Sequence, residues 1–225
     1  MICDRIKRVR DQMADAAAKA GRNVSDITLI GVTKTVDASV INEAIDAGIT
    51  CIGENRVQEL LGKLNDLKPV EKHMIGTLQS NKAHAIVDVV TLIHSLDRIH
   101  LAQKLQELGK KQDRKIEVLV QVNIGNEDTK SGINPQNLFG FLDEVQQLNS
   151  ISVKGLMCIP PPCQAEQVRT YFDQTHELAQ TAAGRHYEGM TFDYLSMGMS
   201  HDFQEAIASG ATHIRVGQAI FGSRK

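Results

Sequence analysis

The stretch Ile27-Thr-Leu-Ile-Gly-Val-Thr33 and the segment from Asp37 to Gly48 that follows it decide the fold. The first is a short apolar run rich in β-branched residues, which is typical of a strand buried in a parallel sheet. The second places apolar residues at helical spacing between Asp37, a favoured N-cap residue, and Gly48, which ends the helix. A strand followed directly by a helix is the repeating unit of a parallel α/β fold.

The same unit returns along the rest of the chain. Further strand candidates lie at residues 50–53, 73–76, 91–95, 116–123, 151–158, 194–197 and 213–216. Eight strands imply roughly 25 residues per unit, which suits a right-handed β/α crossover repeated eight times. An amphipathic helix over residues 3–20 would replace the helix that is missing after the last strand. We therefore predict a single (β/α)8 TIM barrel with an extra N-terminal helix, one domain across residues 1–225. A doubly wound open sheet is the alternative, because periodicity alone does not separate the two.

Composition excludes several function classes. Apolar residues make up 42% of the chain and charged residues 23%, and Lys plus Arg is 25 against 27 for Asp plus Glu. Neither this balance nor any run of like charge indicates binding to nucleic acid or to an anionic membrane. No apolar stretch reaches the roughly 18–20 residues of a membrane span, and the N-terminus lacks the hydrophobic region of a signal peptide. We expect a cytoplasmic protein.

The four cysteines are too few and too scattered for a disulfide framework, so we expect reduced thiols at Cys3, Cys51, Cys158 and Cys163. The pair Cys158 and Cys163 has no second pair or nearby histidine to complete a ligand set. We predict no metal site.

Polar and glycine residues cluster where the predicted strands end, on the face where barrel proteins build their sites. Lys34 directly follows an apolar run, so its amine would lie at the barrel mouth beside apolar walls that favour the neutral, nucleophilic form. The alternative is a lysine at the end of a strand whose side chain is simply exposed to solvent. Asn55, Ser80 and Asp97 follow the next three strands and would face the same mouth, but each also suits a helix N-cap.

The loops after the seventh and eighth strands contain Ser196-Met-Gly-Met-Ser200 and Arg215-Val-Gly217-Gln218. Barrels commonly hold phosphate at this place, with small hydroxyls, backbone amides and a helix N-terminus. Alternatively, Gly198 and Gly217 only permit tight turns. The long polar loop over residues 123–135 is either functional or a plain surface loop.

Taken together, a lysine at the barrel mouth and a phosphate site opposite match the needs of pyridoxal 5'-phosphate, or PLP. Its aldehyde reacts with an amine, and its phosphate accepts hydrogen bonds from amides and hydroxyls. Arg215 would lie between the two, near the pyridine nitrogen.

The sequence resembles the pyridoxal phosphate homeostasis protein family, also called the proline synthase co-transcribed homologues, over nearly its whole length. The resemblance rests on Gly31-Val-Thr-Lys34-Thr, Ile52-Gly-Glu-Asn-Arg-Val-Gln-Glu59, His73-Met-Ile-Gly76, Leu78-Gln-Ser-Asn-Lys82, Gly155-Leu-Met157, Leu195-Ser-Met-Gly-Met-Ser200 and Ile214-Arg-Val-Gly217. It implies a barrel similar to the N-terminal domain of alanine racemase.

The resemblance also implies roles for individual residues. PLP would be held as a Schiff base, the internal aldimine, on Lys34. Ser200 and the amides near Gly217 and Gln218 would hold the phosphate, and Arg215 would meet the pyridine nitrogen. Asn55 would line the cofactor pocket. The chain departs from the family pattern at Lys72 and Thr77, where the family often has Trp and His, so the rim of the pocket differs while these contacts are retained.

We expect a non-catalytic carrier of PLP that acts as a monomer in PLP homeostasis and supplies apo-PLP enzymes. A PLP-dependent amino-acid racemase is the alternative, and a barrel enzyme that forms a Schiff base with sugar phosphates is a third possibility. Alanine racemase takes a second acid/base from a tyrosine in a separate domain, and we expect no such domain here. The three tyrosines, Tyr171, Tyr187 and Tyr194, fall on a helix, on the loop after it and at the start of a strand, away from the barrel mouth.

Overall fold

A computed structural model describes residues 1–127 and 129–222 and shows a closed parallel barrel of eight strands. The strands are β1 (Thr28–Val32), β2 (Cys51–Glu54), β3 (Glu71–Met74), β4 (Leu92–Leu96), β5 (Ile116–Val122), β6 (Ile151–Cys158), β7 (Tyr194–Ser196) and β8 (His213–Val216). Each strand pairs with the next, and β8 pairs with β1 from Thr28↔His213 to Gly31↔Val216. This last pairing confirms the predicted barrel and excludes the open sheet.

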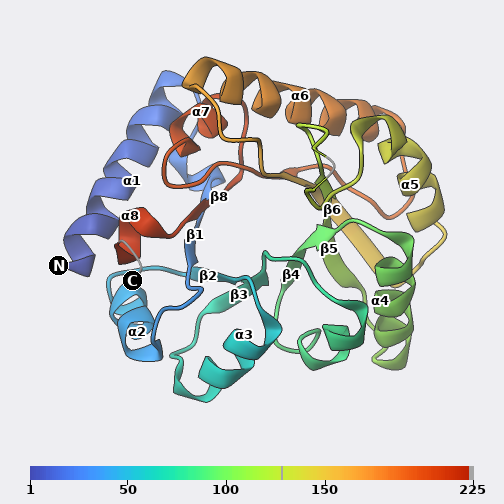
Figure 1. The fold of residues 1–225 in the computed structure, drawn as a ribbon, viewed down its shortest axis with the longest axis horizontal. Helices are drawn as coiled ribbons and strands as arrows, with labels where there is room; N and C mark the ends of the chain where they lie inside the picture. Colours follow the sequence, from blue (N-terminus) through green and yellow to red (C-terminus); the bar gives the residue numbers. More distant parts are fainter. Residues whose placement is uncertain (128, 223–225) are drawn as a thin grey trace.

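The helices form a ring outside the strands (Figure 1). They are α1 (Ile2–Lys19), α2 (Ala38–Asp46), α3 (Val57–Lys63), α4 (Ile99–Lys111), α5 (Leu138–Val145), α6 (Ala165–Gly184), α7 (Phe203–Ala208) and α8 (Gln218–Phe221). Four short 3₁₀ helices complete the described part of the chain: η1 (Val24–Asp26), η2 (Leu64–Asp66), η3 (Ser80–Ala85) and η4 (Pro135–Asn137). Between β3 and β4 the chain therefore crosses by the 3₁₀ segment η3, where the other crossovers use an α-helix.

Helix α1 covers the barrel at the place that the very short α8 leaves open. Its apolar stripe, which includes Ile6, Val9 and Met13, is buried as the spacing predicts. The two helices lie side by side in Figure 1, and the Arg5 guanidinium donates to the carbonyl of Ile220 at 3.5 Å. The N-terminal helix thus completes the outer ring beside the last strand.

The main apolar core lies between the strands and the helices, where each buried Leu or Ile side chain stabilises the fold by about 1.5–3 kcal/mol. A second, much smaller apolar cluster consists of Leu92, Leu119 and Met157, with Tyr194 packed against it. These four residues come from β4, β5, β6 and β7. Several fully buried polar side chains, among them His94 and Arg215, share the interior of the barrel.

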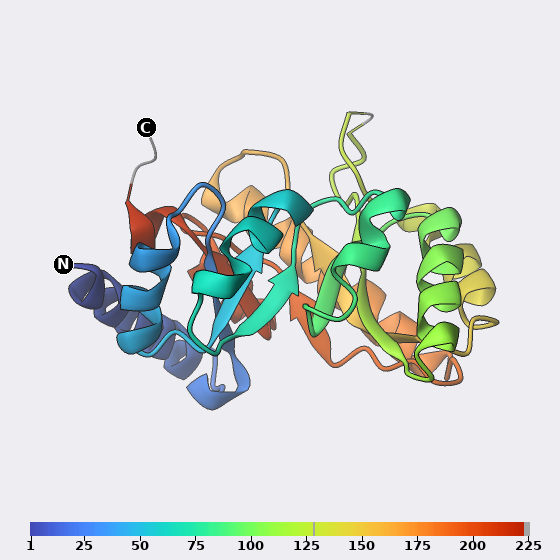
Figure 2. The same cartoon turned by 90° about the horizontal axis from the view of Figure 1, so that it is seen from below.

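The carboxyl ends of the strands form one face, from which the loops after β5 and β6 project on the upper side of Figure 2. The loop after β5 is held in part by the Gln121 side-chain amide, which donates to the carbonyl of Ser131 at 3.1 Å. Cys51 and Cys158 are buried and Cys3 and Cys163 are exposed, and all four are free thiols. Within the described residues, no helix has both the length and the apolar character needed to cross a bilayer.

Candidate ligand-binding cavity

A cavity of about 240 Å³ opens at the carboxyl ends of β1, β2, β7 and β8. Its lining consists of Val32, Lys34, Asn55, Ile75, Ile159, Met199, Ser200, His201, Arg215, Gly217 and Gln218. All six residues that the sequence singled out for the cofactor are in this set. The topology brings them together because the first and last strands are neighbours in a closed barrel.

Lys34 lies in a tight turn directly after β1. The turn is held by its neighbours: the Thr35 amide donates to the Glu59 carboxylate at 2.9 Å, and the Lys63 ammonium donates to the Thr33 carbonyl at 2.9 Å. Thr35 has φ of +58°, which bends the chain sharply away from the strand. Lys34 is exposed at the mouth of the barrel, where it lines the cavity together with the apolar side chains of Val32 and Ile75.

Asn55 carries a buried side-chain oxygen, Oδ1, that has no hydrogen-bond partner among the described residues. Helix α3 has its N-cap at Arg56, so Asn55 does not cap it. Ser80 and Asp97 are not N-caps either: Ser80 is the first residue inside η3, and Asp97 instead accepts a hydrogen bond from Arg98. A buried oxygen without a partner costs about 1–3 kcal/mol, which a ligand that donates a hydrogen bond would recover.

Arg215 lies on β8 with only 4% of its surface exposed. Its Nη1 donates to the Ser196 hydroxyl at 2.6 Å, and its Nη2 donates to the carbonyl of Cys158 at 2.8 Å. Burial lowers the pKa of Arg215, which remains a cation because a guanidinium keeps its proton in proteins. The side chain is therefore a fixed positive group at the wall of the cavity.

Ser200 and the turn after β8 form the other end of the cavity. The Ser200 Oγ accepts from the Ala219 amide at 3.3 Å, so the hydroxyl proton can be donated to an anion. Helix α8 begins at Gln218 with Gly217 as its N-cap. The tight-turn interpretation holds for Gly198, which has φ of +88° and where a Cβ would lie 2.5 Å from the Ala206 Cβ. It does not hold for Gly217, whose φ is −112°.

Sequence reasoning missed five lining residues. Val32, Ile75, Ile159 and Met199 supply apolar surface, and His201 bonds to Gln218 at 3.4 Å between His Nε2 and Gln Oε1. Ile159 and Met199 are 37% and 39% exposed, so both present apolar surface to solvent at the mouth of the cavity. Each of the five ends a strand or lies just beyond one, and that position was the available signal.

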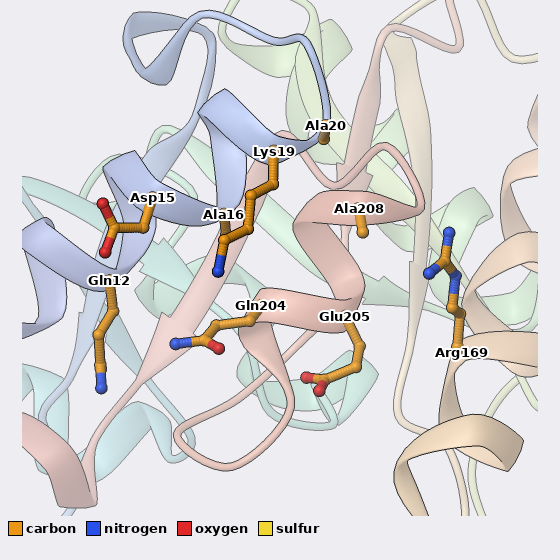
Figure 3. A pocket seen from close by; sticks show the side chains of 9 residues that line it. All are labelled: Gln12, Asp15, Ala16, Lys19, Ala20, Arg169, Gln204, Glu205 and Ala208. Atoms are coloured by element: carbon orange, nitrogen blue, oxygen red, sulfur yellow. The ribbon is translucent and has the colours of Figure 1, made fainter.

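A second hollow lies on the outer wall between α1, α6 and α7 (Figure 3). In Figure 3, Asp15 and Lys19 extend from α1, Glu205 from α7 and Arg169 from α6. Two acidic and two basic groups give this surface no preference for a ligand of one charge. None of the sequence-predicted site residues lines it.

Comparison with known proteins places the chain in a family. A family model described as alanine racemase, N-terminal domain, matches residues 7–225. The pyridoxal phosphate homeostasis protein of Aquifex aeolicus is 43% identical over 99% of this chain and 98% of its own length. The protein of the same name from Escherichia coli K12 is 39% identical over 99% and 97%. Among solved structures, PipY of Synechococcus elongatus PCC7942 with PLP bound is 34% identical and superposes with a TM-score of 0.86, covering 99% of this chain and 100% of that one. The chain belongs to the alanine racemase N-terminal domain family and, within it, to the pyridoxal phosphate homeostasis proteins.

Proposed function

We propose that this protein binds PLP in the cavity at the carboxyl ends of its strands and serves in intracellular PLP homeostasis. The observation that carries the proposal is the convergence of Lys34, Asn55, Ser200 and Arg215 on one cavity of about 240 Å³. An aldehyde with a phosphate and a nitrogen ring requires a primary amine, a hydroxyl donor and a cationic donor, and Lys34, Ser200 and Arg215 supply them. The names of the relatives and the PLP-bound structure of PipY support the same cofactor.

Each lining residue has a distinct role in this proposal. Lys34 offers the amine that holds the aldehyde carbon covalently, with loss of one water molecule. Ser200 and the backbone at Gly217 and Gln218 hold the phosphate, and Arg215 faces the ring nitrogen. Asn55 accepts a hydrogen bond with its buried Oδ1. When bound, PLP supplies an electrophilic carbonyl and an electron-accepting ring.

We further propose that the protein carries PLP in the cytoplasm without turning over a substrate, acts as a monomer and supplies apo-PLP enzymes. The homeostasis names of the relatives support a carrier. An arginine that donates to the ring nitrogen also weakens the ring as an electron sink, because it does not protonate that nitrogen. None of Tyr171, Tyr187 and Tyr194 lines the cavity, so these tyrosines do not supply the second acid/base that a two-base racemase needs.

The test is to identify the lysine that carries the cofactor. The protein is loaded with PLP, treated with borohydride to reduce the carbon–nitrogen double bond, digested and analysed by mass spectrometry. We expect the pyridoxyl phosphate label on Lys34, no visible absorption above free PLP in Lys34→Ala, and full loading in the control Lys82→Ala. A label chiefly on Lys82 or Lys130 would contradict the proposed site.

A further inference from the structure

A continuous line of polar side chains crosses the interior of the barrel from the floor of the cavity to the opposite end. Arg215 Nη1 lies 2.6 Å from Ser196 Oγ, and Ser196 Oγ lies 2.9 Å from His94 Nδ1. His94 Nε2 is 3.0 Å from His73 Nδ1, and His73 Nε2 is 3.1 Å from Glu71 Oε1. Glu71 is the first residue of β3, so the line ends at the amino-terminal face of the barrel.

The chemistry of the two ends, together with a single proton on each imidazole, sets the direction of every hydrogen bond in this line. A guanidinium can only donate, and an ionised carboxylate can only accept. Ser196 therefore accepts from Arg215 and donates its proton to His94 Nδ1. His94 then donates from Nε2 to His73 Nδ1, and His73 donates from Nε2 to Glu71. With the proton of each ring on Nε2, the line runs without a break from Arg215 to Glu71.

Burial and charge agree with this arrangement. His94 is fully buried, and burial lowers the pKa of its imidazole well below the ordinary value, with the charge of Arg215 acting in the same direction. The hydrogen bond from His73 lowers the pKa of Glu71 to about 2, so the carboxylate stays ionised. The Thr91 hydroxyl also donates to Glu71 Oε1, at 2.9 Å. A cation at one end, an anion at the other and neutral donors between them polarise one another in the same sense.

A metal ion is a competing use of the amino-terminal end of this line, because ligand atoms of Cys51, Glu71 and His73 lie within 4.8 Å of one another. However, His73 Nε2 already donates to Glu71 in the structure. Burial also raises the pKa of the Cys51 thiol, so a metal that bound there would have to displace the thiol proton. The hydrogen-bonded line accounts for His73 and Glu71 without a metal.

We propose that Glu71, His73, His94 and Ser196 are positioning residues for Arg215: they form a one-directional relay that fixes its guanidinium at the cavity and couples ligand affinity there to a carboxylate at the opposite end of the barrel. The relay itself stands on the hydrogen-bond geometry alone. Only the choice of PLP as the probe ligand rests on the proposed function.

The first test uses no ligand. In protein labelled with ¹⁵N-histidine at pH 7, long-range proton–nitrogen correlation spectra distinguish the two tautomers of each ring. We expect His73 and His94 both to be protonated on Nε2. A proton on Nδ1 of either ring would overturn the relay, because the line could then not run from Arg215 to Glu71.

Two variants then test the coupling, each with a matched control. His94→Gln interrupts the middle of the relay, whereas His213→Gln changes a neighbouring buried ring, 6.2 Å from His94, that bonds instead to Thr212 Oγ1. Glu71→Ala removes the distal acceptor, whereas Glu117→Ala removes another carboxylate of similar exposure, 45% against 48%. PLP affinity is measured by equilibrium dialysis, and circular dichroism verifies folding.

We expect His94→Gln to weaken PLP binding on the order of tenfold, the effect of misplacing one charge-assisted hydrogen bond. Glu71→Ala should weaken it by a few-fold and produce an Nδ1-protonated population of His73, while both controls stay within twofold of the wild type. Unchanged affinity in Glu71→Ala would overturn the coupling, and because Glu71 is half exposed this variant should fold even if His94→Gln does not. If PLP binds to no form of the protein, the proposed function fails while the tautomer measurement still decides the relay.

Discussion

Replacing the buried imidazole of His213 should make the stability of the barrel less sensitive to mild acid. His213 is the first residue of β8 and is 6% exposed. Burial is the main cause that lowers its pKa from 6.5 to about 4. Between these two values the unfolded chain binds a proton that the folded chain does not, so the free energy of unfolding falls as the pH falls.

The size of the effect follows from the two pKa values. At pH 5 the unfolded imidazole is almost fully protonated and the folded one almost fully neutral, a difference that corresponds to about 2 kcal/mol between pH 7 and pH 5. His94 changes stability in the same direction, since its pKa is also lowered. Carboxylates contribute little above pH 5, because their unfolded pKa values lie near 4.

The measurement is urea unfolding followed by circular dichroism at pH 7 and pH 5, for the wild type and for His213→Gln. The wild type should lose at least about 2 kcal/mol on acidification, and the variant should lose about 2 kcal/mol less than the wild type. Comparing the two differences removes the contributions of all other titrating groups. Equal losses in both proteins would refute the argument, as would a wild type that is more stable at pH 5.

Three further predictions concern the cavity, the barrel and catalysis. Ser200→Ala should weaken PLP binding by roughly ten- to a hundredfold in equilibrium dialysis with unchanged thermal unfolding, because one hydrogen bond to the phosphate is lost; an unchanged dissociation constant would place the phosphate elsewhere. Gly155→Ala should lower the free energy of unfolding, measured by thermal unfolding, by more than about 3 kcal/mol, because the φ of Gly155 is +154° and a Cβ there would overlap the carbonyl of Tyr194. The control Gly140→Ala on α5 places its methyl group in open space and should be neutral or stabilising. The PLP-loaded protein should exchange the α-proton of L-alanine in deuterated water, followed by NMR, far more slowly than about one per second; Lys34-dependent turnover at that rate would favour the racemase.

Much of the fold could be predicted because strands and helices differ in apolar periodicity. All eight strands lie within three residues of the predicted bounds, and α1 buries the predicted stripe. Periodicity says nothing about whether the sheet closes, which depends on the pairing of β1 with β8. The segment η3 also differs from an α-helix for reasons that its short, mixed sequence does not reveal.

The candidate site could be predicted only where position along the chain determines position in space. Residues directly after parallel strands share one face, so Lys34, Ser200 and Gly217 could be brought together without coordinates. The interior relay could not, because His73, His94 and Ser196 lie on three strands whose relative register and inward direction become fixed only when the barrel closes. The exposure of Lys34 likewise depends on the turn at Thr35, whose positive φ the sequence does not indicate.

The cavity lies across the seam where the first strand of the barrel meets the last. Lys34 and Asn55 follow β1 and β2, while Ser200 and Arg215 belong to the segment from β7 to β8. A ligand that is bonded to Lys34 and to Ser200 would act as a cross-link between chain segments separated by most of the sequence. Such a link removes loop-closure entropy from the open state, and its stabilising effect grows with ligand concentration. The concentration of free cofactor would thereby determine the stability of the closed barrel. The backbone amides of β1 and β8 should therefore exchange with solvent most slowly in the loaded protein.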